Sequence, residues 1–228
     1  MCDSFEKKAL DIIKDCLKNE NNGYKKYAII KSNSDSNHKC AYTCYRICED
    51  NYIGNVSSKA SNLWAIPDLR YNNRGIIKEI PQKNVGKHIV LVLESPHRDE
   101  FLSQLTAPAL GQTGKRIHEY LWKLLNDSQL LDDNESAVYL VNAVQYQCSL
   151  GFETNLYRDL IFKKMLSKED LVARIQKCNP SIIIVASTVS TKKDILDILK
   201  DEPDFEGKIY CASEHPSVWN DNTKISKL

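Results

Sequence analysis

The chain has 228 residues, of which 42% are hydrophobic and 27% charged, and a mean hydropathy of −0.43, values typical of a globular protein. A net charge of +1 and a pI of about 7.5 exclude a strongly basic protein that coats nucleic acid, but they leave room for one local basic face. No apolar run approaches the roughly 18 residues of a membrane-spanning helix, and the acidic start MCDSFE is unlike a secretory signal. We therefore expect a cytoplasmic protein whose eight cysteines are thiols or metal ligands rather than disulfides.

Residues 1–85 are interpreted as an N-terminal extension. Apolar residues at helical spacing predict a helix over residues 4–17, whereas residues 51–85 are rich in Asn, Lys, Gly and Pro and predict an irregular connection. Between these segments, a four-residue spacing would place three cysteines on one helix face: Cys40, Cys44 and Cys48. Structural zinc sites usually combine a close pair with a distant pair. A metal site and reduced, packed cysteines both stay open, and we predict no metal.

Residues 86–228 are predicted to form an α/β domain. Residues 89–93 are continuously apolar and mostly β-branched, which predicts a strand that is buried on both faces. Three similar runs follow at 137–144, 181–186 and 208–212, and helical patterns lie between them, including residues 156–166, 168–178 and 192–199. Strands that alternate with helices predict parallel βαβ units. We therefore expect three α/β/α layers around a central four-stranded parallel sheet.

A polar residue follows or ends each of the four predicted strands. These residues are Glu94, Asn142, Ser187 and His215. Parallel strands point their carboxyl ends toward the same edge of the sheet, which is where open α/β sheets bind ligands. Each residue taken singly could also be an ordinary cap or loop residue. Their common position predicts a candidate site at that edge.

Five motifs, in order, resemble those of the uracil-DNA glycosylase superfamily. They span about residues 87–219 and read LVLESPHRDEF, APALGQTGKRI, YLVNAVQYQ, NPSIIIVAST and ASEHPSVW. In that superfamily the first motif brings a catalytic carboxylate or amide, the third an Asn that reads the pyrimidine edge, and the last a His-Pro-Ser sequence. The resemblance implies the same fold and a DNA N-glycosylase activity. Residues 1–85 do not share it.

The resemblance also implies roles for individual residues. Glu94 would stabilise the positive charge that develops on the sugar and orient a water, and His215 would stabilise the negative charge on the departing base. Asn142 would bind the N3 and C4 edge of the flipped base, and His97 could contact the substrate as well. Phosphate contacts are expected from Ser95, Ser187, Ser217 and Lys224. The gap left by the flipped base would be filled by Val218 and Trp219.

Two positions depart from the superfamily pattern. Leu93 stands where a glycine is common, and Ala109 stands where an aromatic side chain usually stacks on the base. Alanine removes a stacking surface worth about 1–3 kcal/mol per base and opens the base-binding pocket. We therefore expect a larger, modified pyrimidine as substrate, of the kind found in some viral DNA, and a role in defence against such DNA or in base-excision repair.

The resulting hypothesis is a monofunctional DNA glycosylase whose partner is DNA. Water is the nucleophile, so no cofactor is expected, and no lysine follows a strand where it could attack the sugar. One alternative is a catalytically silent module of the same fold that binds nucleic acid or a protein. Another is an enzyme that hydrolyses free nucleosides or nucleotides.

Overall fold

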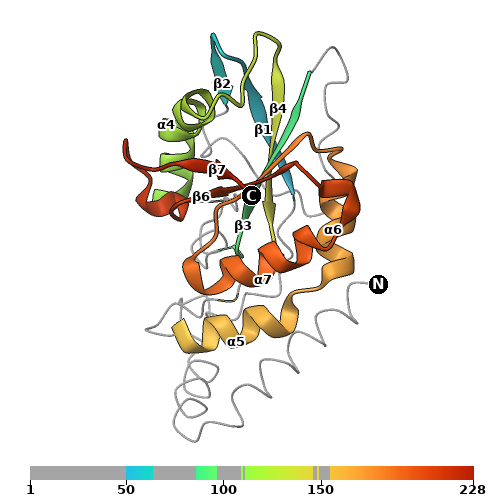
Figure 1. Cartoon of the computed structure of the whole chain (residues 1–228). Coiled ribbons are helices and arrows are strands. Elements are labelled where there is room, and N and C mark those ends of the chain that lie inside the picture. Colours follow the sequence, from blue (N-terminus) through green and yellow to red (C-terminus); the bar gives the residue numbers. More distant parts are fainter. Residues whose placement is uncertain (1–49, 64–85, 97–108, 110, 146–147, 149–154) are drawn as a thin grey trace, which may run out of the picture.

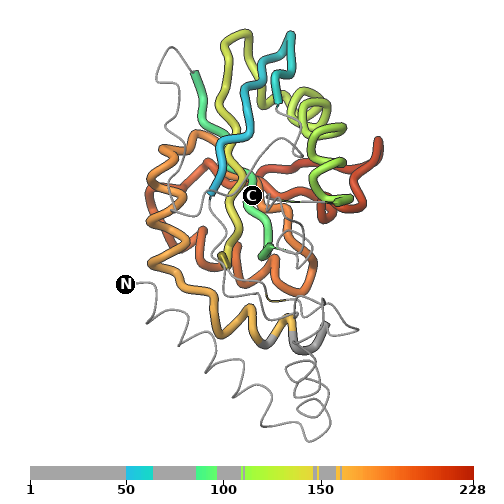
Figure 2. Tube along the Cα trace, turned by 180° about the vertical axis from the view of Figure 1, so that it is seen from behind, coloured from blue at the N-terminus to red at the C-terminus, as the bar shows by residue number. Residues whose placement is uncertain are grey.

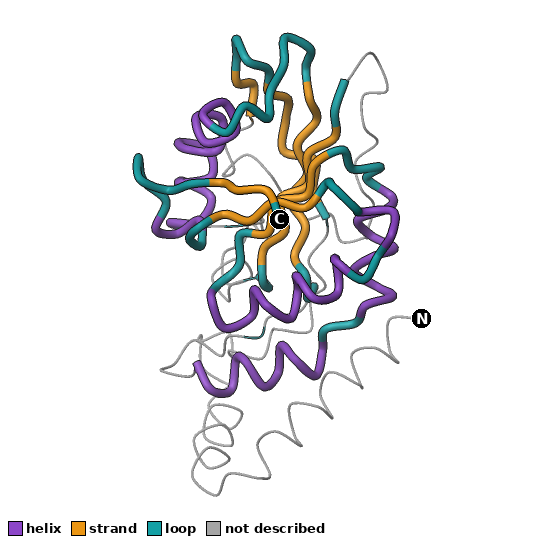
Figure 3. Tube along the Cα trace, viewed as in Figure 1, coloured by secondary structure: helices purple, strands orange, loops and turns teal. Residues whose placement is uncertain are grey.

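The computed structural model describes residues 50–63, 86–96, 109, 111–145, 148 and 155–228. One seven-stranded sheet forms its centre (Figures 1 and 3). The strands are β1 (Asn51–Val56), β2 (Ser61–Leu63), β3 (His88–Leu93), β4 (Ser136–Asn142), β5 (Ile182–Val185), β6 (Ile209–Ala212) and β7 (Ile225–Lys227). The helices are α4 (Gln112–Asp127), α5 (Asn155–Met165), α6 (Lys168–Lys177) and α7 (Val189–Lys200), with two 3-10 turns, η3 (Pro203–Phe205) and η4 (Pro216–Val218).

The four predicted strands are confirmed as β3, β4, β5 and β6, but the predicted four-stranded sheet is too small. The strand order is β2-β1-β4-β3-β5-β6-β7. The central four strands are parallel to one another, whereas β1, β2 and β7 pair antiparallel. The fold class is therefore α/β with a mixed seven-stranded sheet, and the expectation of a purely parallel sheet is wrong.

Strands β1 and β2 lie in a segment for which we predicted an irregular connection. Apolar Ile53 and Val56 are separated by Gly54 and the polar Asn55, so the segment has no continuous apolar run. Its structure comes from antiparallel pairing with β4, interrupted by a bulge between Tyr52 and Gly54. Gly54 has φ 124°, and a Cβ atom there would lie 2.4 Å from the Asn62 carbonyl oxygen. The sheet thus begins before residue 86, while the predicted helix over 4–17 and the three spaced cysteines lie outside the described residues.

Each face of the sheet is covered by helices. Along β3, Val90 and Val92 pack toward α5, α6 and α7, whereas Ile89, Leu91 and Leu93 pack toward α4. Figures 1 and 2 show α4 on one side of the strands and α6 and α7 on the other. Each fully buried side chain of this kind stabilises the fold by about 1.5–3 kcal/mol. Two apolar layers therefore fix β3 in the middle of the molecule.

The helix boundaries agree with sequence signals in part. The Oγ atom of Ser167 accepts a hydrogen bond of 3.2 Å from the Asp170 amide, which confirms the predicted start of α6. Helix α4 starts after Gly111, which has no side chain to cap the first turn. In the described ranges, no helix has the length and apolar character needed to cross a membrane.

Candidate active site

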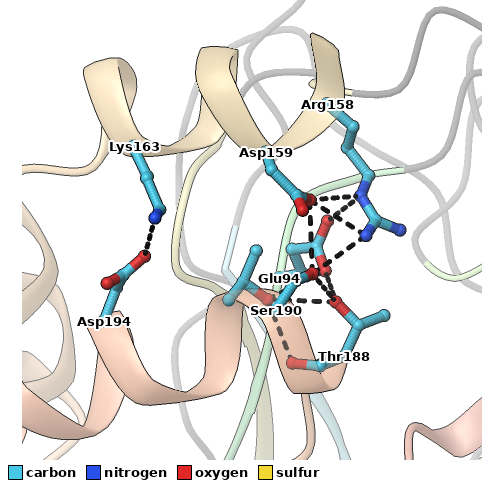
Figure 4. Close-up of polar contacts among 8 residues, drawn as sticks. Glu94, Arg158, Asp159, Lys163, Thr188, Ser190 and Asp194 are labelled. Atoms are coloured by element: carbon cyan, nitrogen blue, oxygen red, sulfur yellow. Dashed lines mark hydrogen bonds and ion pairs between the residues drawn. The ribbon is translucent and has the colours of Figure 1, made fainter. Parts of the chain in front are cut away.

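Glu94 immediately follows β3, and its carboxylate is buried between α5 and α7. Its side chain is 6% exposed. Two hydroxyls from the start of α7 donate to its Oε2 atom, Thr188 at 2.5 Å and Thr191 at 2.9 Å. Figure 4 shows the carboxylate between the two helices, next to Arg158. The predicted position of Glu94 at a strand end is confirmed. Its carboxylate is also buried and bound by side chains of two helices.

Arg158 of α5 provides the positive charge beside this carboxylate. Its Nε atom lies 3.2 Å from Glu94 Oε1. The guanidinium also donates hydrogen bonds of 3.0 Å to Asp159 and 3.1 Å to the Ser190 hydroxyl, and Ser190 in turn donates to Asp159. The Arg158 side chain is 20% exposed. Arg158 therefore lies beside the buried carboxylate and keeps part of its surface in solvent.

The two oxygens of Glu94 differ in what surrounds them. Oε2 accepts two hydroxyl hydrogen bonds, whereas Oε1 is ion-paired and accepts no hydrogen bond from the described residues. A carboxylate offers about four lone-pair positions in total. Oε1 therefore retains acceptor capacity for a water or a substrate hydroxyl.

His215 follows β6 and is fixed by the turn that comes after it. Its Nδ1 atom accepts a hydrogen bond of 3.2 Å from the Ser217 amide and lies 2.9 Å from the Ser217 hydroxyl. An Nδ1 that accepts an amide hydrogen carries no proton, so in the neutral ring the proton is on Nε2. Burial, and then the charges of Arg158 and Lys192, lower the pKa of His215 to about 4. The ring is therefore neutral near pH 7 and presents Nε2–H as a donor.

Lys192 of α7 lies at the same edge, although it does not follow a strand. Its Nζ atom donates a hydrogen bond of 2.8 Å to the Ala212 carbonyl, at the end of β6. The residue arrives from a helix and not from a strand, which is why the strand-end pattern missed it. Its ammonium group is engaged with the backbone that leads to His215.

Asn142 ends β4 and is buried, next to Leu93 of β3 in the parallel register. Along β4, Val138 and Leu140 pack toward α4, so strand alternation directs the Asn142 side chain to the α4 side. Glu94 instead lies between α5 and α7, ion-paired with Arg158, and the charge of Arg158 also lowers the pKa of His215. The structure thus places the three residues at the carboxyl ends of parallel strands, with Glu94 and His215 both under the influence of Arg158.

The remaining predicted contacts differ widely in exposure. Val218 is 57% exposed and Lys224 is exposed, so both can meet a partner, whereas Trp219 is 0% exposed. The indole of Trp219 packs with α4 and donates a hydrogen bond of 2.9 Å to the Glu214 carbonyl. This burial argues against the predicted insertion of Trp219 into DNA, because the apolar ring contributes to the core instead.

The serines and Ala109 fall into separate settings. Ser95 is half-buried, Ser217 orients His215, and the buried Ser187 hydroxyl has no hydrogen-bond partner among the described residues. Ala109 is buried with φ 49°. His97 lies outside the described residues. The described ranges contain no group of three or more His, Cys, Asp or Glu side chains arranged to hold a metal.

Three residues near Glu94 and His215 were not predicted from the sequence: Arg158, Thr191 and Lys192. All three lie on helices, at positions that no motif marks, and only the packing of α5 and α7 against the end of β3 brings them to Glu94 and His215.

Comparisons of the chain with protein-family models, with curated proteins and with solved structures found no match.

Proposed function

We propose that the protein is a monofunctional DNA glycosylase with a uracil-DNA glycosylase-like fold, which hydrolyses the N-glycosidic bond of a flipped pyrimidine. One observation supports this more than any other. Arg158 is ion-paired with Glu94 at one strand end, and its charge lowers the pKa of His215 at another. An acceptor and a neutral donor are thus held at the carboxyl edge of a parallel core.

Breaking the N-glycosidic bond requires stabilisation of opposite charges on its two sides. Positive charge develops on the sugar, and the bonding electron pair leaves with the base. Glu94 Oε1 is proposed to orient the attacking water and to stabilise the sugar cation. The His215 Nε2–H is proposed to donate to the pyrimidine O2, where negative charge accumulates. A neutral histidine suits this role because its low pKa keeps the ring unprotonated while Nε2 retains its hydrogen.

The positive charges at this edge support a polyanionic substrate. The first turns of α4 and α7 start at the carboxyl ends of the strands and contain Lys115 and Lys192, with Arg116 and Lys193 next in the chain. Helix N-termini and basic side chains both favour phosphate groups. A local basic edge is consistent with a net charge of only +1 over the whole chain.

The proposed substrate is a modified pyrimidine, and the proposed roles are defence against modified viral DNA or base-excision repair. The support is the small side chain of Ala109, which stands where the superfamily stacks an aromatic ring. Extruding the base from the duplex costs roughly a few kcal/mol. The exposed Val218, after the His-Pro-Ser sequence, is the residue proposed to fill the vacated position.

The test is base release measured by mass spectrometry. The purified protein is incubated with DNA that contains uracil and with DNA that contains hydroxymethylated or glucosylated cytosine. Glu94→Gln should reduce release by at least about 100-fold, the lower end of what a positioned acid or base contributes. Glu206→Gln is the matched control, since Glu206 is exposed and precedes β6 at the opposite edge of the sheet.

The other outcomes separate the alternatives. No release from any DNA, with DNA binding retained, would replace the enzyme by a silent binding module. Release from mononucleotides but not from DNA would indicate a nucleoside or nucleotide hydrolase. Release of plain uracil, with every modified pyrimidine untouched, would remove the proposed preference but keep the reaction.

A further inference from the structure

A second buried ion pair lies at the end of β4, apart from the Glu94 cluster. Asp50 immediately precedes β1, and its Oδ1 atom accepts a hydrogen bond of 2.8 Å from Arg174 Nη1 of α6. The side chains are 4% and 9% exposed, respectively. Burying two charges is costly, and it is seldom justified by stability alone, because well-packed apolar residues often stabilise as much.

Arg174 binds the backbone that leaves the sheet at Asn142. Its Nη1 donates 3.0 Å to the Asn142 carbonyl and its Nη2 donates 3.0 Å to the Ala143 carbonyl. Among the described residues, β1 pairs with β4 as far as Asn51 opposite Leu140, and these two carbonyls lie beyond that pair. The guanidinium therefore provides donors to the backbone that follows the described ladder.

The other side of the same backbone is held by β3. The amides of Ala143 and Val144 donate to the carbonyls of Leu93 and Glu94, at 2.9 and 3.0 Å. The peptide units after Asn142 are thus fixed by their N–H groups to the end of β3 and by their carbonyls to Arg174. Because Glu94 is in the same chain segment, this arrangement also connects Asn142 to the catalytic strand end.

We propose that Arg174, held by Asp50, is a positioning residue for Asn142 and thereby sets which pyrimidine edge the site accepts. The inference rests on the proposed function and on the role that the resemblance implies for Asn142, which is to bind the edge of the flipped pyrimidine. An amide side chain presents a carbonyl or an NH2 group, so its discrimination between a uracil-type and a cytosine-type edge depends on a fixed backbone. Displacements of about 1 Å can change rates about 100-fold.

The planar fork of arginine is what this arrangement requires. With described residues the guanidinium makes four hydrogen bonds in different directions, one of them from Nε to Asp170 at 2.9 Å. Lysine retains the charge but provides a compact ammonium without the fork. Asp170 is 46% exposed and contacts only Nε, so its loss leaves both carbonyl contacts in place.

The experiment compares Arg174→Lys with Asp170→Asn in the full chain. Single-turnover base release is measured on DNA with uracil and on DNA with hydroxymethylcytosine, together with amide hydrogen exchange at Ala143 and Val144. Arg174→Lys should bring the ratio of the two release rates at least about 10-fold closer to one and accelerate exchange at both amides. Asp170→Asn should change neither. Where Arg174→Lys does not fold, Asp50→Asn should show both changes in the same direction.

The outcomes are distinguishable. An unchanged rate ratio and unchanged exchange in a folded Arg174→Lys protein would overturn the proposal and leave Arg174 a structural residue. Faster amide exchange with an unchanged ratio of release rates would show that Arg174 fixes the backbone but does not determine which pyrimidine is accepted. Failure of the wild-type protein to release any base would overturn the proposed function, and the selectivity with it. The amide exchange rates at Ala143 and Val144 would then still test whether Arg174 fixes the backbone at Asn142.

Discussion

Two arginine–carboxylate pairs lie at neighbouring strand ends, and they are built in opposite ways. At the end of β3 the carboxylate is the centre, because Arg158, Thr188 and Thr191 all converge on Glu94. At the end of β4 the guanidinium is the centre, because Asp50, Asp170 and two carbonyls all accept from Arg174. One arrangement orients an acid, and the other orients a backbone.

Exposure follows the same division. The Arg158 side chain is 20% exposed and that of Arg174 is 9% exposed. A partly exposed arginine can contact a ligand from solvent. A fully enclosed arginine depends on acceptors from the protein itself, and losing them leaves an unpaired buried charge. The comparison indicates that adjacent ion pairs with the same chemistry can have separate purposes, one proposed to act on substrate and one to hold the chain.

Removing the two arginines should therefore have unequal effects on stability. Arg174→Met removes the guanidinium from the buried Asp50 carboxylate and from two backbone carbonyls, and we expect it to lower the free energy of unfolding by about 3–5 kcal/mol. Arg158→Met leaves Glu94 with its two hydroxyl donors and removes a cation that is 20% exposed, so we expect a smaller loss. Urea unfolding of both variants measures the difference. Equal losses would mean that the two pairs do not differ in kind.

The pH dependence of stability should have opposite signs at two of the buried groups. Burial raises the pKa of Asp50 to about 6 from 3.8, so its contribution is full below about pH 4 and is lost as the pH rises through 6. Burial lowers the pKa of His215 to about 4 from 6.5, so its contribution is full above about pH 6.5 and is lost as the pH falls through 4.

Two difference measurements separate these contributions. The free energy of unfolding of the wild type minus that of Asp50→Asn should fall between about pH 4 and 6. The wild type minus His215→Asn should rise between about pH 4 and 6.5. Chemical denaturation at several pH values tests both. Two slopes of the same sign would show that one of the two groups is not buried as described.

The smallest expected effect concerns the charges around His215. Burial is the largest cause of its low pKa, and the charges of Arg158 and Lys192 are secondary. Arg158→Gln and Lys192→Gln should each raise the pKa of His215 and leave it below 6.5, as measured by NMR titration of the ring. Lys193→Gln, at an exposed neighbouring position, is the control. A rise with Lys193→Gln equal to that with Lys192→Gln would indicate general screening and not proximity.

The parallel strands could be predicted because their signal is local. Residues 89–93 and 182–185 are apolar on both faces, and such runs have few other stable arrangements. The position of Glu94 at a strand end follows directly. Strand β1 could not be predicted, because its pairing with β4 and its bulge at Gly54 depend on contacts far along the chain.

The candidate site was only partly predictable for the same reason. Glu94 and His215 are marked by strand ends, but Arg158 has no sequence signal, since nothing local distinguishes it from other basic helix residues. Trp219 was misjudged because a position next to a polar motif says little about burial. Its ring meets α4, which starts more than 100 residues earlier in the chain.

The two outermost strands of the sheet have a consequence for solubility. Strands β2 and β7 are three residues long each, and they end the order β2-β1-β4-β3-β5-β6-β7. Long flat edges offer unpaired backbone groups to another chain and promote aggregation, whereas short edges with polar or charged side chains offer little. Ser61 and Asn62 on β2 and Ser226 and Lys227 on β7 are exposed. In the part of the chain that the structure describes, the apolar centre of the sheet is thereby flanked by short polar edges that offer little to strand pairing with another molecule.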